Sequence, residues 1–232
     1  MPNDMLFPDR YLRNADSVTA EEQEILKNAS VLVAGCGGLG GYVIELLARV
    51  GVGNITGVDG DVFQPSNLNR QLFSKESNIG AFKAEEAMVR LAEINSEVNF
   101  TAVCGMLTEE NADKLLSGKS VAVDALDNAE ARLILARAAG KAGIPMVHGA
   151  ISGWHTRVYT VMPGDNLLET LFSGGGTGTE KMSGNLPFTA ALCASQQAAE
   201  TVKLILGKGN TSAGRIIETD LLDMTFEEID LR

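Results

Sequence analysis

The chain has 232 residues, of which 45% are hydrophobic, and this length suits one large domain or one domain with an appendage. Its formal net charge of −11 argues against broad nucleic-acid binding, which needs a basic surface. Residues 1–16 lack the apolar segment of a signal peptide, and no apolar run is long enough to span a bilayer. We therefore expect a cytoplasmic protein that binds neither nucleic acid nor membrane.

The cysteine content argues against a disulfide framework and against a structural zinc site. The three cysteines, Cys36, Cys104 and Cys193, lie far apart, and no C-x-x-C pair is present. A site with four cysteine ligands cannot form from three thiols, so we expect no structural zinc. Cys193 falls early in a predicted helix, and we interpret it as a packing residue rather than a reactive thiol.

The first predicted elements are an irregular N-terminal arm and a short helix. Residues 1–16 have no regular pattern, although residues 10–14 combine two arginines with a tyrosine. Thr19 and Glu22 have the spacing of a capping box, which predicts a helix from Thr19 to about Lys27.

A glycine-rich turn joins a predicted strand, Val31–Ala34, to a predicted helix, Tyr42–Val50. This order points free backbone N–H groups and a helix N-terminus at a phosphate. A second apolar strand, Ile55–Val58, ends at Asp59, whose carboxylate is placed to hold ribose hydroxyls. The pattern predicts a nucleotide site, and a tight turn without a ligand is the alternative. The candidate residues are Gly35, Gly37, Gly38, Leu39, Gly40 and Asp59.

Loop 60–80 is long for a structureless connection, which favours a functional role. The helix predicted over Ala81–Asn95 has Lys83 in its first turn, where a cation is unfavourable unless an anion is present. A dinucleotide site has no evident use for Asn67, Arg70 and Lys83 together. A triphosphate site does, because guanidinium and ammonium groups neutralise charge as pyrophosphate leaves.

Two carboxylates follow the predicted strand Val121–Val123. Asp124 and Asp127 would lie at the ligand edge of a parallel sheet. Either of them is placed to bind Mg²⁺, a cation that prefers carboxylate, water and phosphate oxygens. For Asp127 the alternative is a cap for the helix predicted over Ala129–Ala142.

The second half of the chain continues the pattern and then changes. His148, which follows a predicted strand, is interpreted as a satisfied interior residue rather than a base. Residues 163–187, which include a glycine-rich run, are expected to form a mobile loop that acts as a lid, a substrate-threading loop or a plain linker. The remaining predicted elements are strands at Val98–Val103, Ile144–Val147, Arg157–Met162, Arg215–Thr219 and Thr225–Leu231, and helices at Glu109–Leu116 and Thr189–Leu206.

These elements predict an α/β fold with a doubly wound, Rossmann-like and mainly parallel sheet whose late strands are antiparallel. We expect one domain over residues 1–232. It would comprise an N-terminal arm and helix (1–30), a nucleotide-binding core (31–150) and a mixed tail (151–232).

Taken together, the motifs resemble the ThiF/MoeB/HesA adenylyltransferases, bacterial relatives of ubiquitin-activating enzymes, from about Arg10 to Leu231. The resemblance is carried by Gly35–Gly40, Gly51–Gly53, Asp59–Asp61, Ser66–Gln71, Gly80–Lys83 and Asp127–Asn128. It implies a single adenylation domain that uses ATP to adenylate the C-terminal Gly-Gly carboxylate of a ubiquitin-like sulfur carrier protein, with release of pyrophosphate. A carboxylate is already a nucleophile at neutral pH, so no general base is needed.

The resemblance also implies a nucleotide site built around the glycine turn. The turn and Asp59 would hold adenosine and ribose, and Asp61 and Gln71 would belong to the same site.

The residues implied in catalysis are Arg13, Arg70, Lys83 and Asp127. Asn67, Arg70 and Lys83 would grip the triphosphate. Asp127 would bind Mg²⁺. Arg13 matches an arginine that family members offer across a homodimer to the partner's ATP.

Two departures from the family pattern limit what the resemblance implies. Many members carry a zinc site of two C-x-x-C pairs, and residues 163–168 stand here in place of the first pair. The glycine-rich loop 173–185 contains no cysteine that could accept the acyl group. We therefore expect activation to stop at the acyl-adenylate or to hand it to another protein.

Three alternatives stay open at this point. An NAD-dependent oxidoreductase shares the glycine turn and Asp59 but gives no role to Arg70, Lys83 and Asp127 together. The second alternative is an enzyme that adenylates a small-molecule or tRNA-borne carboxylate, although the acidic chain disfavours tRNA. A non-catalytic scaffold is a third. The sequence does not name the carrier or its pathway.

Overall fold

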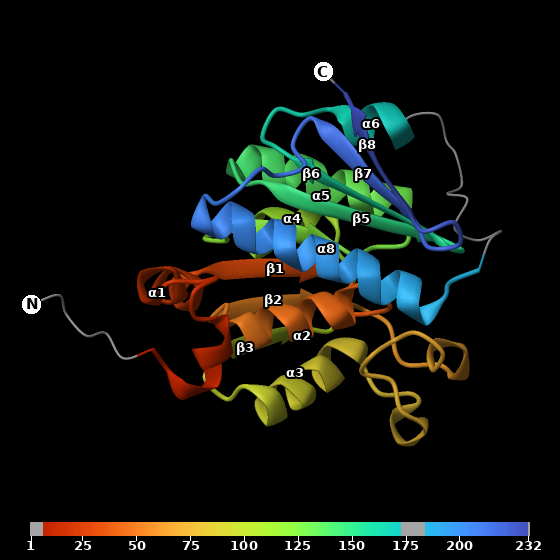
Figure 1. Cartoon of the computed structure of the whole chain (residues 1–232). Helices are drawn as coiled ribbons and strands as arrows, with labels where there is room; N and C mark the ends of the chain where they lie inside the picture. The colour runs from red at the N-terminus through yellow and green to blue at the C-terminus, as the bar shows by residue number, and fades with distance from the viewer. Residues whose placement is uncertain (1–6, 173–183, 232) are drawn as a thin grey trace, which may run out of the picture.

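The computed structural model describes residues 7–172 and 184–231. Helices cover both faces of one sheet, with α2, α3 and α8 on one face and α4 and α5 on the other (Figure 1). The glycine-rich residues 173–179, which were expected to be mobile, lie outside the described residues.

The sheet has eight strands in the order β3-β2-β1-β4-β5-β6-β7-β8. β3, β2, β1, β4 and β5 are parallel, whereas β6, β7 and β8 are antiparallel. The predicted Rossmann-like sheet with late antiparallel strands is therefore confirmed. The strands are β1 (Ser30–Ala34), β2 (Asn54–Val58), β3 (Asn99–Val103), β4 (Val121–Asp124), β5 (Met146–Ser152), β6 (His155–Val161), β7 (Arg215–Asp220) and β8 (Thr225–Asp230).

Apart from α6, the α-helices begin and end close to the predicted positions. α6 corrects the expectation of a loop throughout residues 163–187, because Leu168 is buried and residues 167–172 are helical. Thr19 and Glu22 form the expected capping box at the start of the first helix. The α-helices are α1 (Ala20–Asn28), α2 (Gly40–Val50), α3 (Lys83–Ile94), α4 (Glu109–Leu116), α5 (Ala129–Ala142), α6 (Leu167–Phe172) and α8 (Pro187–Leu206). The residues that the structure describes also form three 3₁₀ helices: η1 (Asp9–Asn14), η2 (Pro65–Asn67) and η3 (Glu76–Asn78).

Two expectations from the sequence need correction. The N-terminal arm is not irregular throughout, because residues 9–14 form η1, which is held by the buried side chain of Tyr11 and its hydrogen bond from Asn95. His148 does not follow β5 but lies inside it. The reason is that β6 pairs with β5 from Met146 to Ser152, which extends the strand beyond the short apolar run.

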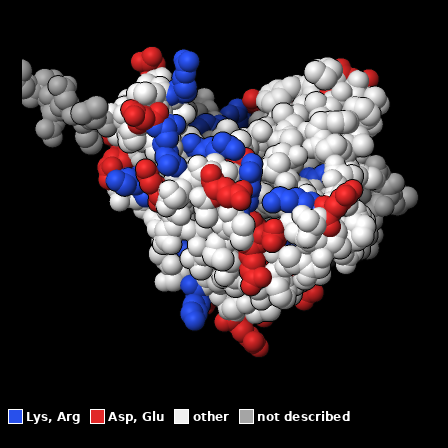
Figure 2. Space-filling view, turned by 90° about the horizontal axis from the view of Figure 1, so that it is seen from below, with Lys and Arg blue, Asp and Glu red and all other residues white. Residues whose placement is uncertain are grey.

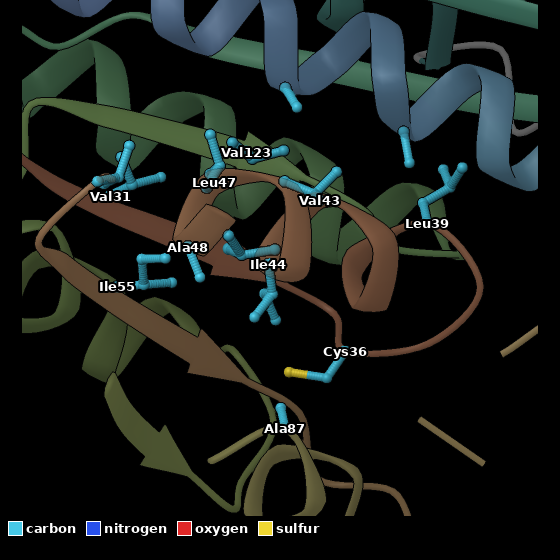
Figure 3. Close-up of a cluster of buried hydrophobic side chains, with 14 of the residues drawn as sticks. Val31, Cys36, Leu39, Val43, Ile44, Leu47, Ala48, Ile55, Ala87 and Val123 are labelled. Carbon is cyan, nitrogen blue, oxygen red and sulfur yellow. The ribbon is translucent and has the colours of Figure 1, made fainter. Parts of the chain in front are cut away.

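Alternation along β1 divides the interior into two cores. Val31 and Val33 pack with α2, α3 and α8, whereas Leu32 and Ala34 pack with α4 and α5. The first core is shown in Figure 3, where Val43 and Leu47 of α2 lie on the side that faces α8 and Ile44 points toward Cys36 and Ala87. A central strand buried on both faces is typical of a parallel sheet. This packing fixes the positions at which β1, β2 and β4 end.

Within residues 7–172 and 184–231, no helix combines the length and the apolar character that crossing a membrane requires.

The packing of α2 predicts a strong dependence of stability on Leu47, whose side chain is fully buried. We expect Leu47→Ala to lower the free energy of unfolding by about 2–5 kcal/mol, because it removes buried methyl groups and leaves a cavity. Leu222→Ala is the matched control, because Leu222 is 63% exposed, and it should change stability by less than about 0.5 kcal/mol. Urea denaturation measures both. Equal losses in the two variants would contradict this assignment of the core.

Candidate functional site

A cavity opens at the edge of the sheet where the parallel strands end. Its walls come from the segments that follow β1, β2, β3 and β4, together with part of β5. Carboxyl ends of parallel strands meet at one edge, so residues distant in the sequence converge there. The predicted site residues that line it are Gly35, Gly37, Gly38, Leu39, Asp59, Asp61, Arg70, Gln71, Lys83 and Asp127.

The glycine turn is tight, and its tightness brings backbone to the cavity wall. Gly35 has a φ of +91°, and a Cβ atom on it would lie 2.5 Å from the carbonyl oxygen of Ala125. A Cβ on Gly40 would lie 1.8 Å from the carbonyl oxygen of Gly35. Gly40 therefore lies behind the wall and lets α2 start directly against the turn, with its N-terminus at the cavity.

Asp59 ties the glycine turn to the end of β2. Its Oδ2 accepts a hydrogen bond from the backbone N–H of Cys36 at 2.7 Å, and its Oδ1 accepts one from the N–H of Asp61 at 2.8 Å. Burial raises the pKa of the Asp59 carboxyl, and the nearby Lys83 ammonium opposes that shift. The carboxylate is thus held in place at the wall of the cavity.

Arg70 lies against the glycine turn. A Cβ on Gly38 would lie 3.7 Å from Cγ, Cδ and Nε of Arg70. The guanidinium donates hydrogen bonds to the carbonyl oxygen of Ser66 and to Oδ1 of Asn69, each at 3.0 Å. These bonds restrict the side chain, which lines the cavity, and its contact with phosphate stays a prediction.

Asn67 is not among the described residues that line the cavity. Its Oδ1 accepts a hydrogen bond from the N–H of Gln64 at 2.9 Å, and its carbonyl oxygen accepts bonds from the N–H groups of Arg70 and Gln71. The Oδ1 atom of the side chain is therefore bound within the turn itself. The backbone carbonyl oxygen ties Asn67 to the backbone of Arg70 and Gln71, and a contact of its side chain with phosphate stays a prediction.

Lys83 is the first residue of α3 and lines the cavity. Backbone hydrogen bonds to the segment after β2 hold it there. Its N–H donates to the carbonyl oxygen of Asp61, and Val62 pairs with Phe82 in an antiparallel bridge. Its Nζ lies 2.9 Å from Oδ2 of Asp61. Of this pair, the Lys83 side chain is 9% exposed and the Asp61 side chain 64% exposed.

The two candidate carboxylates after β4 have different environments. Asp124 is fully buried; its Oδ2 lies 2.6 Å from Nδ1 of His148, and its Oδ1 accepts the N–H of Leu126 at 3.0 Å. Asp127 is exposed and lines the cavity. The helix α5 is capped by Asn128, which accepts the N–H of Ala131, so the alternative of a cap at Asp127 is wrong. His148 is a buried, hydrogen-bonded residue, as expected.

Sequence reasoning missed Arg132, which also lines the cavity. It is 3% exposed, donates to the carbonyl oxygen of Leu126 at 2.6 Å and lies with its guanidinium 5.5 Å from the centre of the Phe172 ring. Its Nε is 3.7 Å from Oδ2 of Asp124. The sequence could have indicated Arg132, because residue 132 lies on the same buried helix face as Leu135. An arginine on a buried face needs a polar or charged partner.

The far wall of the cavity includes Gly184 and Asn185, which the sequence assigned only to the loop. The carbonyl oxygen of Gly184 accepts the N–H of Gly153, and that of Asn185 accepts Nδ2 of Asn69 at 3.1 Å. Loop 60–80 and the start of α8 are thereby connected across the mouth of the cavity.

Cys193 packs in the interior. It has no exposed surface, and its Sγ lies near the carbonyl oxygens of Ala150 and Arg157. Burial raises the pKa of this thiol to about 12, so the nucleophilic thiolate is not formed at neutral pH. The interpretation as a packing residue is confirmed.

Arg13 is exposed and is not among the described residues that line the cavity. It lies in η1, beside α1 and at the end of the sheet where β1 begins (Figure 1). The cavity is at the other end of β1. Within one chain, the structure does not bring Arg13 to the other site residues.

Charge on the face seen from below is mixed. Figure 2 shows lysine and arginine side chains interspersed with aspartate and glutamate, beside a wide uncharged area. On that face, the described residues do not present an extended basic surface of the kind that nucleic acids require.

Comparison with curated proteins finds relatives that match almost the whole chain. The SAMP-activating enzyme E1 of Haloferax volcanii is 36% identical, over 97% of this chain and 85% of the relative. The sulfur carrier protein adenylyltransferase of Thermus thermophilus is 34% identical, over 97% and 87%. The molybdopterin-synthase adenylyltransferase of Salmonella typhimurium is 33% identical, over 91% and 86%.

Solved structures with the same fold are more distant in sequence. PaaA superposes with a TM-score of 0.83 at 20% identity and covers 98% of this chain and 85% of that one. MccB of E. coli, in a structure with AMPCPP and MccA, gives the same TM-score and identity, over 100% and 74%. These likenesses support the fold.

The ThiF family pattern matches residues 11–232. The match includes the strand–turn–helix unit, the segment that carries Arg70 and Lys83, and the antiparallel tail. It therefore spans the cavity and the whole described sheet. The chain belongs to the ThiF family.

Proposed function

We propose that this protein is an adenylyltransferase that uses ATP to activate the C-terminal carboxylate of a ubiquitin-like sulfur carrier protein, with release of pyrophosphate. The observation that carries the proposal is the meeting of the glycine turn, Arg70, Lys83 and Asp127 at one cavity. Relatives named as activating enzymes or adenylyltransferases of carriers match more than nine-tenths of the chain and support the substrate class.

The chemistry requires positive charge and alignment more than proton transfer. A carboxylate oxygen attacks the α-phosphorus of ATP, the bond from that phosphorus to the bridging oxygen breaks, and pyrophosphate leaves with the electron pair. The barrier comes from bringing anions together and from charge that grows on the leaving group. Arg70 and Lys83, both at the cavity wall, would neutralise that charge.

The remaining lining residues fit the rest of the nucleotide. Asp59 would accept hydrogen bonds from ribose hydroxyls, and Gly37 and Gly38 allow phosphate to approach the backbone beside the start of α2. Asp127 supplies a carboxylate in the same cavity, a ligand type that suits Mg²⁺. When bound with ATP, Mg²⁺ would neutralise phosphate charge.

We further propose that the active form is a homodimer in which Arg13 of one copy serves the cavity of the other. Arg13 is an exposed cation at the end of its own sheet opposite to the cavity, so any contribution to catalysis requires a second copy.

The phosphate clamp is tested by Arg70→Ala and Lys83→Ala. Each should lower the rate of ATP–pyrophosphate exchange, measured with the carrier, by about 100-fold or more, because a cation that stabilises the leaving group is lost. Lys75→Ala is the matched control, because Lys75 is an exposed cation of the same loop region that does not line the cavity. Circular dichroism checks the fold. Exchange at the wild-type rate in both variants would refute the clamp.

Asp127→Asn should raise the Mg²⁺ concentration needed for half-maximal exchange by about tenfold, since a neutral amide oxygen binds a hard cation more weakly than a carboxylate. Glu130→Gln is the control, because Glu130 is exposed on α5 and does not line the cavity. A Mg²⁺ titration of the exchange rate is the measurement. An unchanged titration in Asp127→Asn would remove Asp127 from the metal site.

Arg13→Ala should abolish ATP–pyrophosphate exchange, and mixing this variant with Lys83→Ala should restore part of the activity. In an equal mixture of Arg13→Ala and Lys83→Ala chains, half of the dimers are mixed, and each mixed dimer has one site with both residues intact. We expect about a quarter of the wild-type rate after subunit exchange. If Arg13 acts within its own chain, the mixture will show no recovery. If Arg13 has no role, Arg13→Ala alone will keep the wild-type rate, which would also contradict the proposal.

A further inference from the structure

The ion pair between Lys83 and Asp61 joins a buried cation to an exposed anion. Nζ of Lys83 is 2.9 Å from Oδ2 of Asp61, yet the two side chains are 9% and 64% exposed. A buried ammonium is costly without a partner, whereas an exposed carboxylate is well solvated with or without one. The lysine therefore depends on the pair more than the aspartate does.

The backbone holds both residues in register, so the contact is built into the fold. Lys83 donates its N–H to the carbonyl oxygen of Asp61 at 3.1 Å, and Phe63 donates its N–H to the carbonyl oxygen of Ala81 at 2.9 Å. The N–H of Asp61 is itself bound to Oδ1 of Asp59 at 2.8 Å. The Asp61 side chain can turn toward water while its backbone stays fixed.

Asp59 is a poorer partner for the ammonium than Asp61. Both of its carboxylate oxygens already accept backbone N–H groups, from Cys36 and from Asp61. Asp61 is thus the carboxylate whose oxygen lies in contact with Nζ. Any phosphate oxygen that binds Lys83 from the cavity must take the place of the Asp61 oxygen or share the ammonium with it.

We propose that Asp61 is an exchangeable counterion for Lys83: its carboxylate occupies the phosphate-binding position of the ammonium in the free protein and is displaced by the β- or γ-phosphate of ATP. This inference rests on the proposed function. It gives Asp61 a role opposite to that of a nucleotide-holding residue. Asp61 holds a buried cation in place, and it weakens ATP binding by competing with it.

The test is the affinity of Asp61→Asn for Mg²⁺-ATP and for AMP, measured by isothermal titration calorimetry. Removing the competing charge should tighten ATP binding by about tenfold, within the usual range for coupled contacting groups. AMP lacks the β- and γ-phosphates, so its affinity should change by less than about twofold. Asp61→Glu keeps the carboxylate and should bind ATP as the wild type does.

Thermal unfolding provides a second readout. Free Asp61→Asn should melt below the wild type, because Lys83 loses its partner, and saturating ATP should raise its melting temperature more than it raises that of the wild type. Asp113→Asn is the matched control, because Asp113 pairs with Lys141 on an exposed surface and does not line the cavity. Asp113→Asn should not alter the affinity for ATP or the affinity for AMP.

The outcomes separate the two claims. If the wild type does not bind ATP, the proposed function fails and this inference fails with it. If the wild type binds ATP but Asp61→Asn binds it equally or more weakly, the function stands and the inference is overturned. Equal tightening for ATP and AMP would also overturn it, because the effect would then be general repulsion rather than competition at Lys83.

Discussion

Positive charge held out of water at one edge of a parallel sheet is the constraint on which the rest of this structure depends. Lys83 and Arg132 are both nearly buried at the cavity, and each lies beside a carboxylate, Asp61 for the first and Asp124 for the second. Buried charges are tolerated only with partners. The partners differ, because Asp124 is fully buried and permanent whereas Asp61 is exposed and can be replaced by a ligand.

This difference divides the cavity into a fixed part and an adaptable part. Asp124 and Arg132 grip Leu126 from both sides, through its N–H and its carbonyl oxygen, and so hold the segment that carries Asp127. In the adaptable part, Arg70 lies along the glycine turn and Lys83 is paired with Asp61, the anion that we propose ATP displaces. A rigid carboxylate side and a cationic side suit a reaction in which positioning and charge neutralisation do most of the work.

Much of the fold was predictable because it follows from local patterns. The apolar run before Gly35, the capping box at Thr19 and the placement of Lys83 in the first turn of a helix each need only neighbouring residues to be recognised. What the sequence could not decide were contacts made across the sheet. The burial of Asp124, for example, depends on its contact with His148 of the neighbouring strand β5, which no local pattern indicates. Arg132 could have been found as a cation on a buried helix face.

The central claim is that the cavity joins ATP to a protein C-terminus, and intact-mass spectrometry of the acceptor tests it most directly. A ubiquitin-like protein ending in Gly-Gly is incubated with the enzyme, ATP and Mg²⁺, beside the same protein without its last glycine. The account predicts an adenylate on the complete C-terminus, removed by added pyrophosphate, and none on the shortened one. An adenylate on both the complete and the shortened protein would contradict the account. The absence of an adenylate from every member of a panel of carriers that end in Gly-Gly would also contradict it.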